Sequence, residues 1–182
     1  MHPIAVQPRQ GNTSTILVRT LMGGAAVFNS VVAGTGVDRV AVQMPAWRIL
    51  GVRPWADYSH RADLQNGAFL YPLSAIGGCA LSMAAAFRFL RNGRAPRAAG
   101  TAVLLSVLLA ATGLALTAQA APQIRSIRRV GDNPIELQRA FNAFDWWGRY
   151  RTAAQFAAFC ANIWALVSLT DGNAGDSPGR TP

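Results

Sequence analysis

The chain has 182 residues, of which 51% are hydrophobic and only 14% charged, and its formal net charge is +9. Soluble domains carry charge on about a quarter of their residues, so this composition argues against a soluble protein. All seventeen basic residues are arginines that stand between long apolar runs, unlike the continuous basic face of a nucleic-acid-binding helix. We therefore expect the lipid bilayer as the partner, through its anionic headgroups, and no nucleic acid.

The two ends of the chain, residues 1–13 and 171–182, are polar and are predicted to be a mobile tail and a disordered tail around a membrane domain at 14–170. Residues 1–13 lack the pattern of a removable signal. Cys79 and Cys160 lie inside apolar runs without CxxC or metal-ligand spacing, so no metal site is predicted. No dinucleotide-binding, P-loop or nucleophile-elbow motif occurs either, and no cofactor is expected.

Four mostly apolar stretches are each long enough to cross the hydrocarbon core as a helix, and we place these spans at 15–37, 68–90, 98–121 and 150–170. In the second span, Gly78, Ser82 and Ala86 fall on one helix face, where small side chains let another helix approach closely. The basic segment 88–97 contains Gly93 and Pro96 and predicts a tight turn. The predicted fold class is all-α, a bundle of four transmembrane helices.

Two long connections, 38–67 and 122–145, should lie on the same side of the membrane. Within the second, Asn133-Pro134-Ile135-Glu136 predicts a helix start, with Asn as the cap and Pro at the first helical position. A helix from there to Leu169 would be about 54 Å long, which exceeds the bilayer core. Its first third must then stand above the membrane and form, with the first connection, an extramembrane cap.

Orientation rests on the short turn at 88–97, which has four arginines and no acidic residue. The positive-inside rule works best for such short loops. We therefore expect an integral protein of the bacterial plasma membrane, with both termini in the cytoplasm.

Polar side chains inside the spans are few. No Asp, Glu, Lys or His falls within an uncharged run, which argues against proton-coupled transport. Asn29 in the first span and Asn162 in the last, with Gln155 above it, have two interpretations. They join neighbouring helices by hydrogen bonds, or they line a ligand cavity.

Two groups of residues at the membrane boundary are candidates for chemistry. His60, which follows Tyr58 and precedes Asp63, is the best general-base candidate, since its side chain titrates near neutrality, although a lone surface histidine is commonly just solvated. Arg149 and Arg151 stand at the entrance of the last span beside Trp146 and Trp147. They are an interfacial anchor, or a fork that holds a planar anionic ligand by hydrogen bonds and cation–π contact.

The pattern Trp147-Gly148-Arg149-Tyr150-Arg151-Thr152, followed by an Ala-rich span that ends in Trp164-Ala165-Leu166, resembles the last helix of the anthrone-oxygenase-like family of small four-span membrane proteins. The segment Met44-Pro45-Ala46 and the proline-containing second span agree with that family, and the resemblance covers roughly residues 15–169. One position departs from it: the family commonly has Asn or His where this chain has Gly148.

This resemblance implies cofactor-independent oxygenation of an apolar polycyclic aromatic such as an anthrone. It suggests His60 or Asp63 as the base, Arg149 and Arg151 as stabilisers of developing negative charge, and Trp146 and Trp147 as walls that stack on the rings. Substrate contacts are also assigned to three further side chains, Tyr58, Asn29 and Asn162. The alternative is a non-catalytic membrane protein that binds a lipid or serves a partner complex. Assembly with further copies of the chain is left open.

Overall fold

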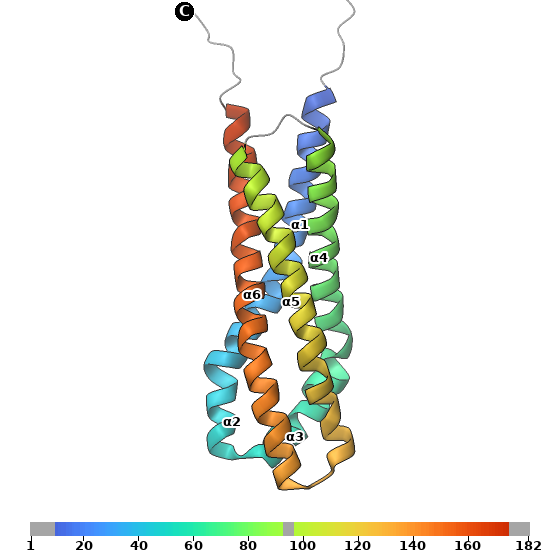
Figure 1. The fold of residues 1–182 in the computed structure, drawn as a ribbon, viewed down its shortest axis with the longest axis vertical. Coiled ribbons are helices and arrows are strands. Elements are labelled where there is room, and N and C mark those ends of the chain that lie inside the picture. Colours follow the sequence, from blue (N-terminus) through green and yellow to red (C-terminus); the bar gives the residue numbers. More distant parts are fainter. Residues whose placement is uncertain (1–9, 93–96, 175–182) are drawn as a thin grey trace, which may run out of the picture.

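The protein is described by a computed structural model covering residues 10–92 and 97–174, which are helical throughout apart from short turns and contain no strand (Figure 1). Four helices are long: α1 (Gln10–Asp38), α4 (Gly67–Asn92), α5 (Arg97–Val130) and α6 (Pro134–Ala174). Between α1 and α4 lie two short helices and two π-helical turns, which are α2 (Met44–Leu50), α3 (Val52–Arg61), η1 (Arg39–Gln43) and η2 (Ala62–Asn66).

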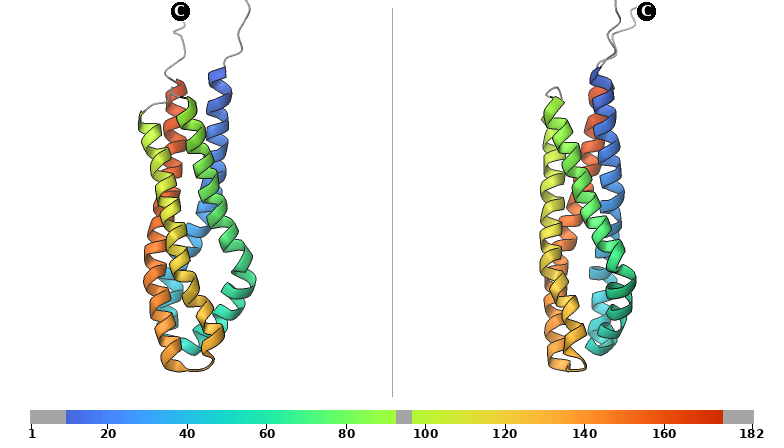
Figure 2. Two further views of the ribbon diagram at one scale, coloured as in Figure 1. Left: turned by 45° about the vertical axis from the view of Figure 1, so that its right-hand side comes forward. Right: turned by 90° about the vertical axis from the view of Figure 1, so that its right-hand side faces the viewer.

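The four long helices run side by side along the long axis of the molecule (Figures 1 and 2). The start of α1 and the end of α6 lie at one end, together with the last turns of α4 and the first turns of α5. The helices α2 and α3 and the turn between α5 and α6 lie at the opposite end. The predicted all-α four-helix bundle, with both long connections on one side, is confirmed.

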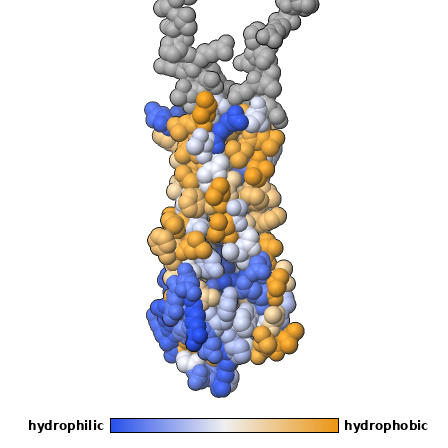
Figure 3. Space-filling model, turned by 180° about the vertical axis from the view of Figure 1, so that it is seen from behind, coloured by the Kyte–Doolittle hydropathy of each residue, from blue (hydrophilic) through white to orange (hydrophobic). Residues whose placement is uncertain are grey.

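Each long helix belongs to a segment that is long and apolar enough to cross a membrane, namely Thr15–Leu50, Val52–Arg91, Ala98–Val130 and Pro134–Thr170. Large apolar side chains such as Val27, Leu108 and Val167 are exposed on the outside of the bundle. On the face drawn in Figure 3, hydrophobic residues cover much of the bundle and hydrophilic ones are concentrated at the end that carries α2 and α3. A helix surface of this kind requires lipid, so the chain is an integral membrane protein. Its orientation stays a prediction.

The polar end has a hydrophobic core of its own. Trp55 of α3 is almost fully buried. Its ring packs edge to face against the ring of Phe141, with the two ring centres 5.2 Å apart. Ile127 from α5 and Leu137 from α6 belong to the same cluster. The connection 38–67, predicted to form part of an extramembrane cap but not to contain helices, is therefore a folded cap, in which Gly51 (φ 99°) supplies the turn between α2 and α3 that an L side chain would strain.

The predicted start of α6 is confirmed. The helix begins at Pro134, and the Asn133 side-chain oxygen accepts hydrogen bonds from the backbone N–H groups of Ile135 (3.1 Å) and Glu136 (3.4 Å). Part of each predicted tail is helical, since α1 begins at Gln10 and α6 ends at Ala174. Their remaining residues, and the Gly93 and Pro96 of the predicted turn, lie outside the described residues.

Small residues bring the helices close together in the membrane half. Its core consists mainly of alanines from α4, α5 and α6 that pack around Val18 and Met22 of α1. At the level of the cap, α1 meets α6 where Gly36 faces Thr152. The predicted small-residue face of α4 is also used, because a side chain at Gly78 would collide with Asn29 of α1. These contacts are typical of membrane bundles.

Candidate functional site

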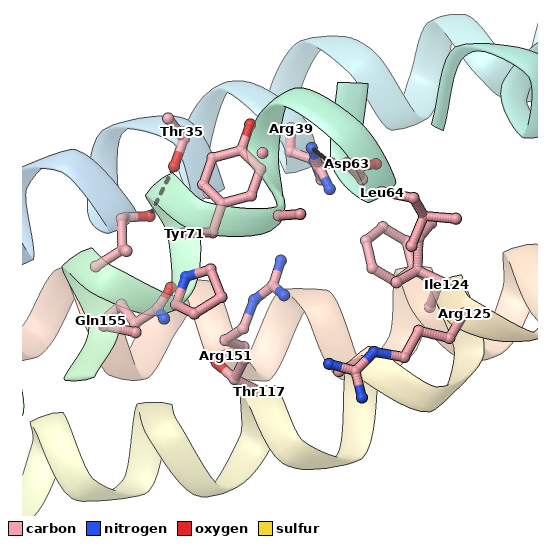
Figure 4. A pocket seen from close by; sticks show the side chains of 18 of the residues that line it. Thr35, Arg39, Asp63, Leu64, Tyr71, Thr117, Ile124, Arg125, Arg151 and Gln155 are labelled. Atoms are coloured by element: carbon pink, nitrogen blue, oxygen red, sulfur yellow. Dashed lines mark hydrogen bonds and ion pairs between the residues drawn. The ribbon is translucent and has the colours of Figure 1, made fainter. Parts of the chain in front are cut away.

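A cavity of about 460 Å³ lies where the bundle joins the cap (Figure 4). Its walls come from α1, η1, η2, α4, α5 and α6. Toward the bundle the walls are mainly small or apolar, with Val32, Pro72, Ala75 and Ala121 among them. Toward the cap they carry arginines from three helical segments, which are Arg39, Arg125, Arg128, Arg129 and Arg151.

The shape of α4 makes room for this cavity. Figure 2 shows its lower half bowing away from α5, while the two helices converge at the other end. Pro72 lies inside α4 and has no N–H for the helix ladder, and the π-helical turn η2 directly precedes the helix. Both features are known causes of helix distortion. The wall of α4 is then completed by residues with little bulk, Gly67, Ala68 and Ala75.

An ion pair closes one side of the cavity. Arg39 is the first residue of η1 and Asp63 the second of η2, and their side chains approach to 2.5 Å with only 12% and 7% of their surface exposed. The Arg39 guanidinium also lies 5.4 Å from the ring centre of Phe144 and 5.8 Å from that of Tyr71. This pair joins the end of the first span to the start of the second.

Arg151 enters the cavity from α6 and points toward the Arg39–Asp63 pair (Figure 4). Its guanidinium lies 5.7 Å from the ring centre of Phe144, so two cations share one aromatic ring. Among the described residues Arg151 forms no ion pair. The lining contains five arginines and one carboxylate, which leaves the walls with a net charge of +4. Such a site favours an anion.

Of the residues predicted for the site, the structure brings Asp63 and Arg151 to the cavity. Arg149 is exposed on the outside of α6 and pairs with Asp145. The predicted fork of Arg149 and Arg151 is therefore divided between two faces, because residues two apart on an α-helix do not face each other. Arg48 of α2 also pairs with Asp145, which fixes α2 against α6.

The aromatic residues and the histidine predicted for the site lie outside the cavity lining. Trp146 is exposed and contacts Tyr150, while Trp147 packs against the cap core. Tyr58 contacts Trp47 on the cap. His60 lies in the last turn of α3, directly after the buried Ser59, and is itself only partly buried.

The two asparagines are buried in the bundle, also outside the cavity lining. The side-chain nitrogen of Asn29 and both polar atoms of Asn162 have no hydrogen-bond partner among the described residues. The interhelical bonds expected for these atoms are thus not formed in the described part of the chain. Gln155 does line the cavity, at its bundle end, and its side chain packs against Gly113 of α5.

Several lining residues were not predicted, although the sequence carries a signal for them. Arg39 directly follows the first span and Asp63 shortly precedes the second, so antiparallel helices place them together. On α5, the residues Arg125, Arg128 and Arg129 have the spacing of one helix face. Phe144 and Tyr71 had no comparable signal.

Gly148, where the chain departs from the family pattern, is buried beside Arg39 and Arg151 at a second, very small cavity of about 10 Å³. A Cβ atom there would meet nothing within 4 Å. The backbone therefore leaves space for a side chain at this position.

No group of three His, Cys, Asp or Glu side chains that could hold a metal ion occurs within residues 10–92 and 97–174. What the site offers instead is an anion-binding wall next to an apolar one. Comparison with protein-family models, with curated proteins and with solved structures gave no match.

Proposed function

We propose that this integral membrane protein binds an amphiphilic anion in the cavity between bundle and cap. The observation that carries the proposal is the wall with five arginines and one carboxylate, in which Asp63 is paired with Arg39 and Arg151 forms no ion pair among the described residues. Charged groups away from water are costly when unpaired, and an anionic ligand would supply the missing partner.

The polarity of the walls predicts how the ligand lies. Along α5 the lining changes from Thr117 and Ala121 on the bundle side to Arg125, Arg128 and Arg129 on the cap side. From Thr117 to Arg125 the helix rises by about 12 Å. The apolar part of the ligand therefore extends toward the bundle and its charged head toward the cap, which matches the orientation of a lipid in the surrounding bilayer.

Native mass spectrometry of the protein purified from its membrane tests this proposal. We expect a bound molecule that combines an anionic head with an apolar tail, retained after neutral detergent is removed in the gas phase. Recovery of zwitterionic lipids alone, or of the empty protein at every detergent concentration, would contradict it.

A second function, the oxygenation implied by the family resemblance, is supported by the position of Asp63. Within the described part of the chain, this is the single carboxylate in the cavity lining, and it lies beside two arginines and the ring of Phe144. In this proposal Asp63 takes a proton from the activated ring CH₂ of an anthrone, and the carbanion passes electrons to O₂. The products are the ring ketone and water, and Arg39 and Arg151 stabilise the negative charge that develops.

Oxygen consumption with an anthrone as substrate distinguishes this function from binding alone. Turnover by the wild type should fall by about 100-fold or more in Asp63→Asn, because a general base contributes at least that much. His60→Gln should keep wild-type turnover, since His60 is not in the cavity lining. A wild type that binds the anthrone without consuming oxygen contradicts the catalytic proposal, and loss with His60→Gln would return the role of base to that residue.

A further inference from the structure

The arginines of the cavity form two groups on different helices. The inner group is Arg39 and Arg151 around Phe144, and the outer group is Arg125, Arg128 and Arg129 on one face of α5. Arg39 already has a carboxylate partner in Asp63, and Arg128 donates a hydrogen bond to the backbone oxygen of Leu64 at 2.9 Å. The described ion pairs include none for Arg125, Arg129 or Arg151.

The side chains of the two groups extend toward the same part of the cavity. Gln155 of α6 packs against Gly113 of α5, so Arg151, one turn before Gln155, lies at the level of Thr117, one turn after Gly113. Side chains on an α-helix point toward its N-terminus, which for α5 means toward Thr117. Figure 4 shows Arg125 extending in this direction along α5, and Arg151 reaching into the cavity from the facing helix.

From this arrangement we infer that the anionic head is a phosphate ester, a lipid phosphate or diphosphate, rather than a carboxylate. The inference rests on the proposed binding of an amphiphilic anion. Guanidinium groups recognise oxyanions through planar pairs of N–H donors. A carboxylate presents two oxygens in one plane, whereas a phosphate monoester presents three terminal oxygens in a tetrahedral arrangement and can receive donors from α5 and α6 together.

The charge of the walls points the same way. The lining has a net charge of +4, and three of its arginines, Arg125, Arg128 and Arg129, are exposed, so a carboxylate head held by the inner group would leave these outer donors to water. A phosphate monoester brings about −1.5 to −2 at neutral pH. A diphosphate ester brings still more negative charge and a second set of phosphoryl oxygens.

The source of the phosphate is the membrane rather than the aqueous phase. The bundle side of the cavity offers Val32, Ala75 and Ala121, which have no use for a soluble phosphate but suit a hydrocarbon tail. Tail and head should therefore both contribute to the affinity.

Four probes test the inference on the full-length protein in nanodiscs of phosphatidylcholine: farnesoate, farnesyl phosphate, farnesyl diphosphate and inorganic diphosphate. Their dissociation constants are measured by titration at fixed ionic strength. We expect each farnesyl phosphate ester to bind at least about 10-fold more tightly than farnesoate, because additional charge-assisted hydrogen bonds are formed. Inorganic diphosphate should bind at least about 10-fold more weakly than farnesyl diphosphate, because it lacks the tail.

A double variant, Arg125→Gln/Arg128→Gln, should weaken the binding of farnesyl diphosphate by about 10-fold or more and that of farnesoate by less than about 3-fold. Arg139→Gln is the matched control, since Arg139 is exposed on α6, pairs with Glu136 and is absent from the cavity lining. It should leave all four dissociation constants unchanged.

The outcomes separate the two proposals. Equal affinity for farnesoate and the farnesyl phosphates overturns the phosphate inference and leaves the binding of an amphiphilic anion intact. Inorganic diphosphate that binds as tightly as farnesyl diphosphate overturns the membrane source. If none of the four probes binds, both the inference and the proposed function fail.

Discussion

Asp63→Ala is expected to lower the free energy of unfolding by about 3–5 kcal/mol, the usual cost of breaking a buried ion pair from one side. The Arg39 side chain is 12% exposed and would lose its carboxylate partner at 2.5 Å. Arg39 and Arg151 would then both lie near the ring of Phe144, with no acidic residue left in the described cavity lining to compensate either charge. Equilibrium unfolding in mixed micelles, followed by tryptophan fluorescence, measures this change.

Removing both partners checks the physical reason. In the double variant Arg39→Ala/Asp63→Ala no arginine is left without its former partner, so its stability should exceed that of Asp63→Ala alone. A single variant that loses less than about 1 kcal/mol would show that the pair is as weak as an exposed salt bridge and does not hold η1 to η2.

Gly36→Leu is expected to lower the free energy of unfolding by about 3 kcal/mol, at the upper end of the range for overpacked positions. A Cβ atom at Gly36 would lie 2.7 Å from the hydroxyl oxygen of Thr152 and 3.3 Å from its Cβ. A change of the Thr152 rotamer cannot relieve the whole contact, because threonine is branched at Cβ and its Cβ position is fixed by the α6 backbone. The helices α1 and α6 would have to separate at the wall of the cavity, and the same unfolding measurement detects the loss.

Gly34 provides the matched control on the same helix, because a Cβ atom there would meet nothing within 4 Å. Gly34→Leu should change the free energy of unfolding by no more than about 1 kcal/mol, the size of the difference in helix propensity. If both leucine variants lost the same stability, the cost would come from removing glycine from α1 and not from the contact with Thr152.

The bundle could be predicted from the sequence because its signals are local. Apolar length and the Asn133-Pro134 helix start each depend on neighbouring residues, and each led to the observed element. The cap was foreseen as an extramembrane element, yet its helices α2 and α3 were not. Their stability depends on burial of Trp55 against Phe141, a contact between residues far apart in the sequence.

The site was predicted in part, for reasons visible in particular residues. Asp63 and Arg151 were among the predicted residues and line the cavity, but Arg149 was grouped with Arg151 although helix geometry places them on different faces. His60 was chosen for its titration range, which does not indicate where a side chain points. Arg39 lies 24 residues from Asp63, and only the antiparallel return of the chain from α1 to α4 brings the two together.

The central claim is tested most directly by native mass spectrometry, which measures how much of the purified protein carries a bound ligand. Three proteins are compared side by side: the wild type, Arg151→Gln and Arg149→Gln. Both substitutions remove one positive charge from α6, but only Arg151 lines the cavity. We predict a bound anionic amphiphile in the wild type and in Arg149→Gln, and its loss in Arg151→Gln. Equal occupancy in all three proteins, or loss in Arg149→Gln alone, would contradict the proposal that this cavity binds the anion.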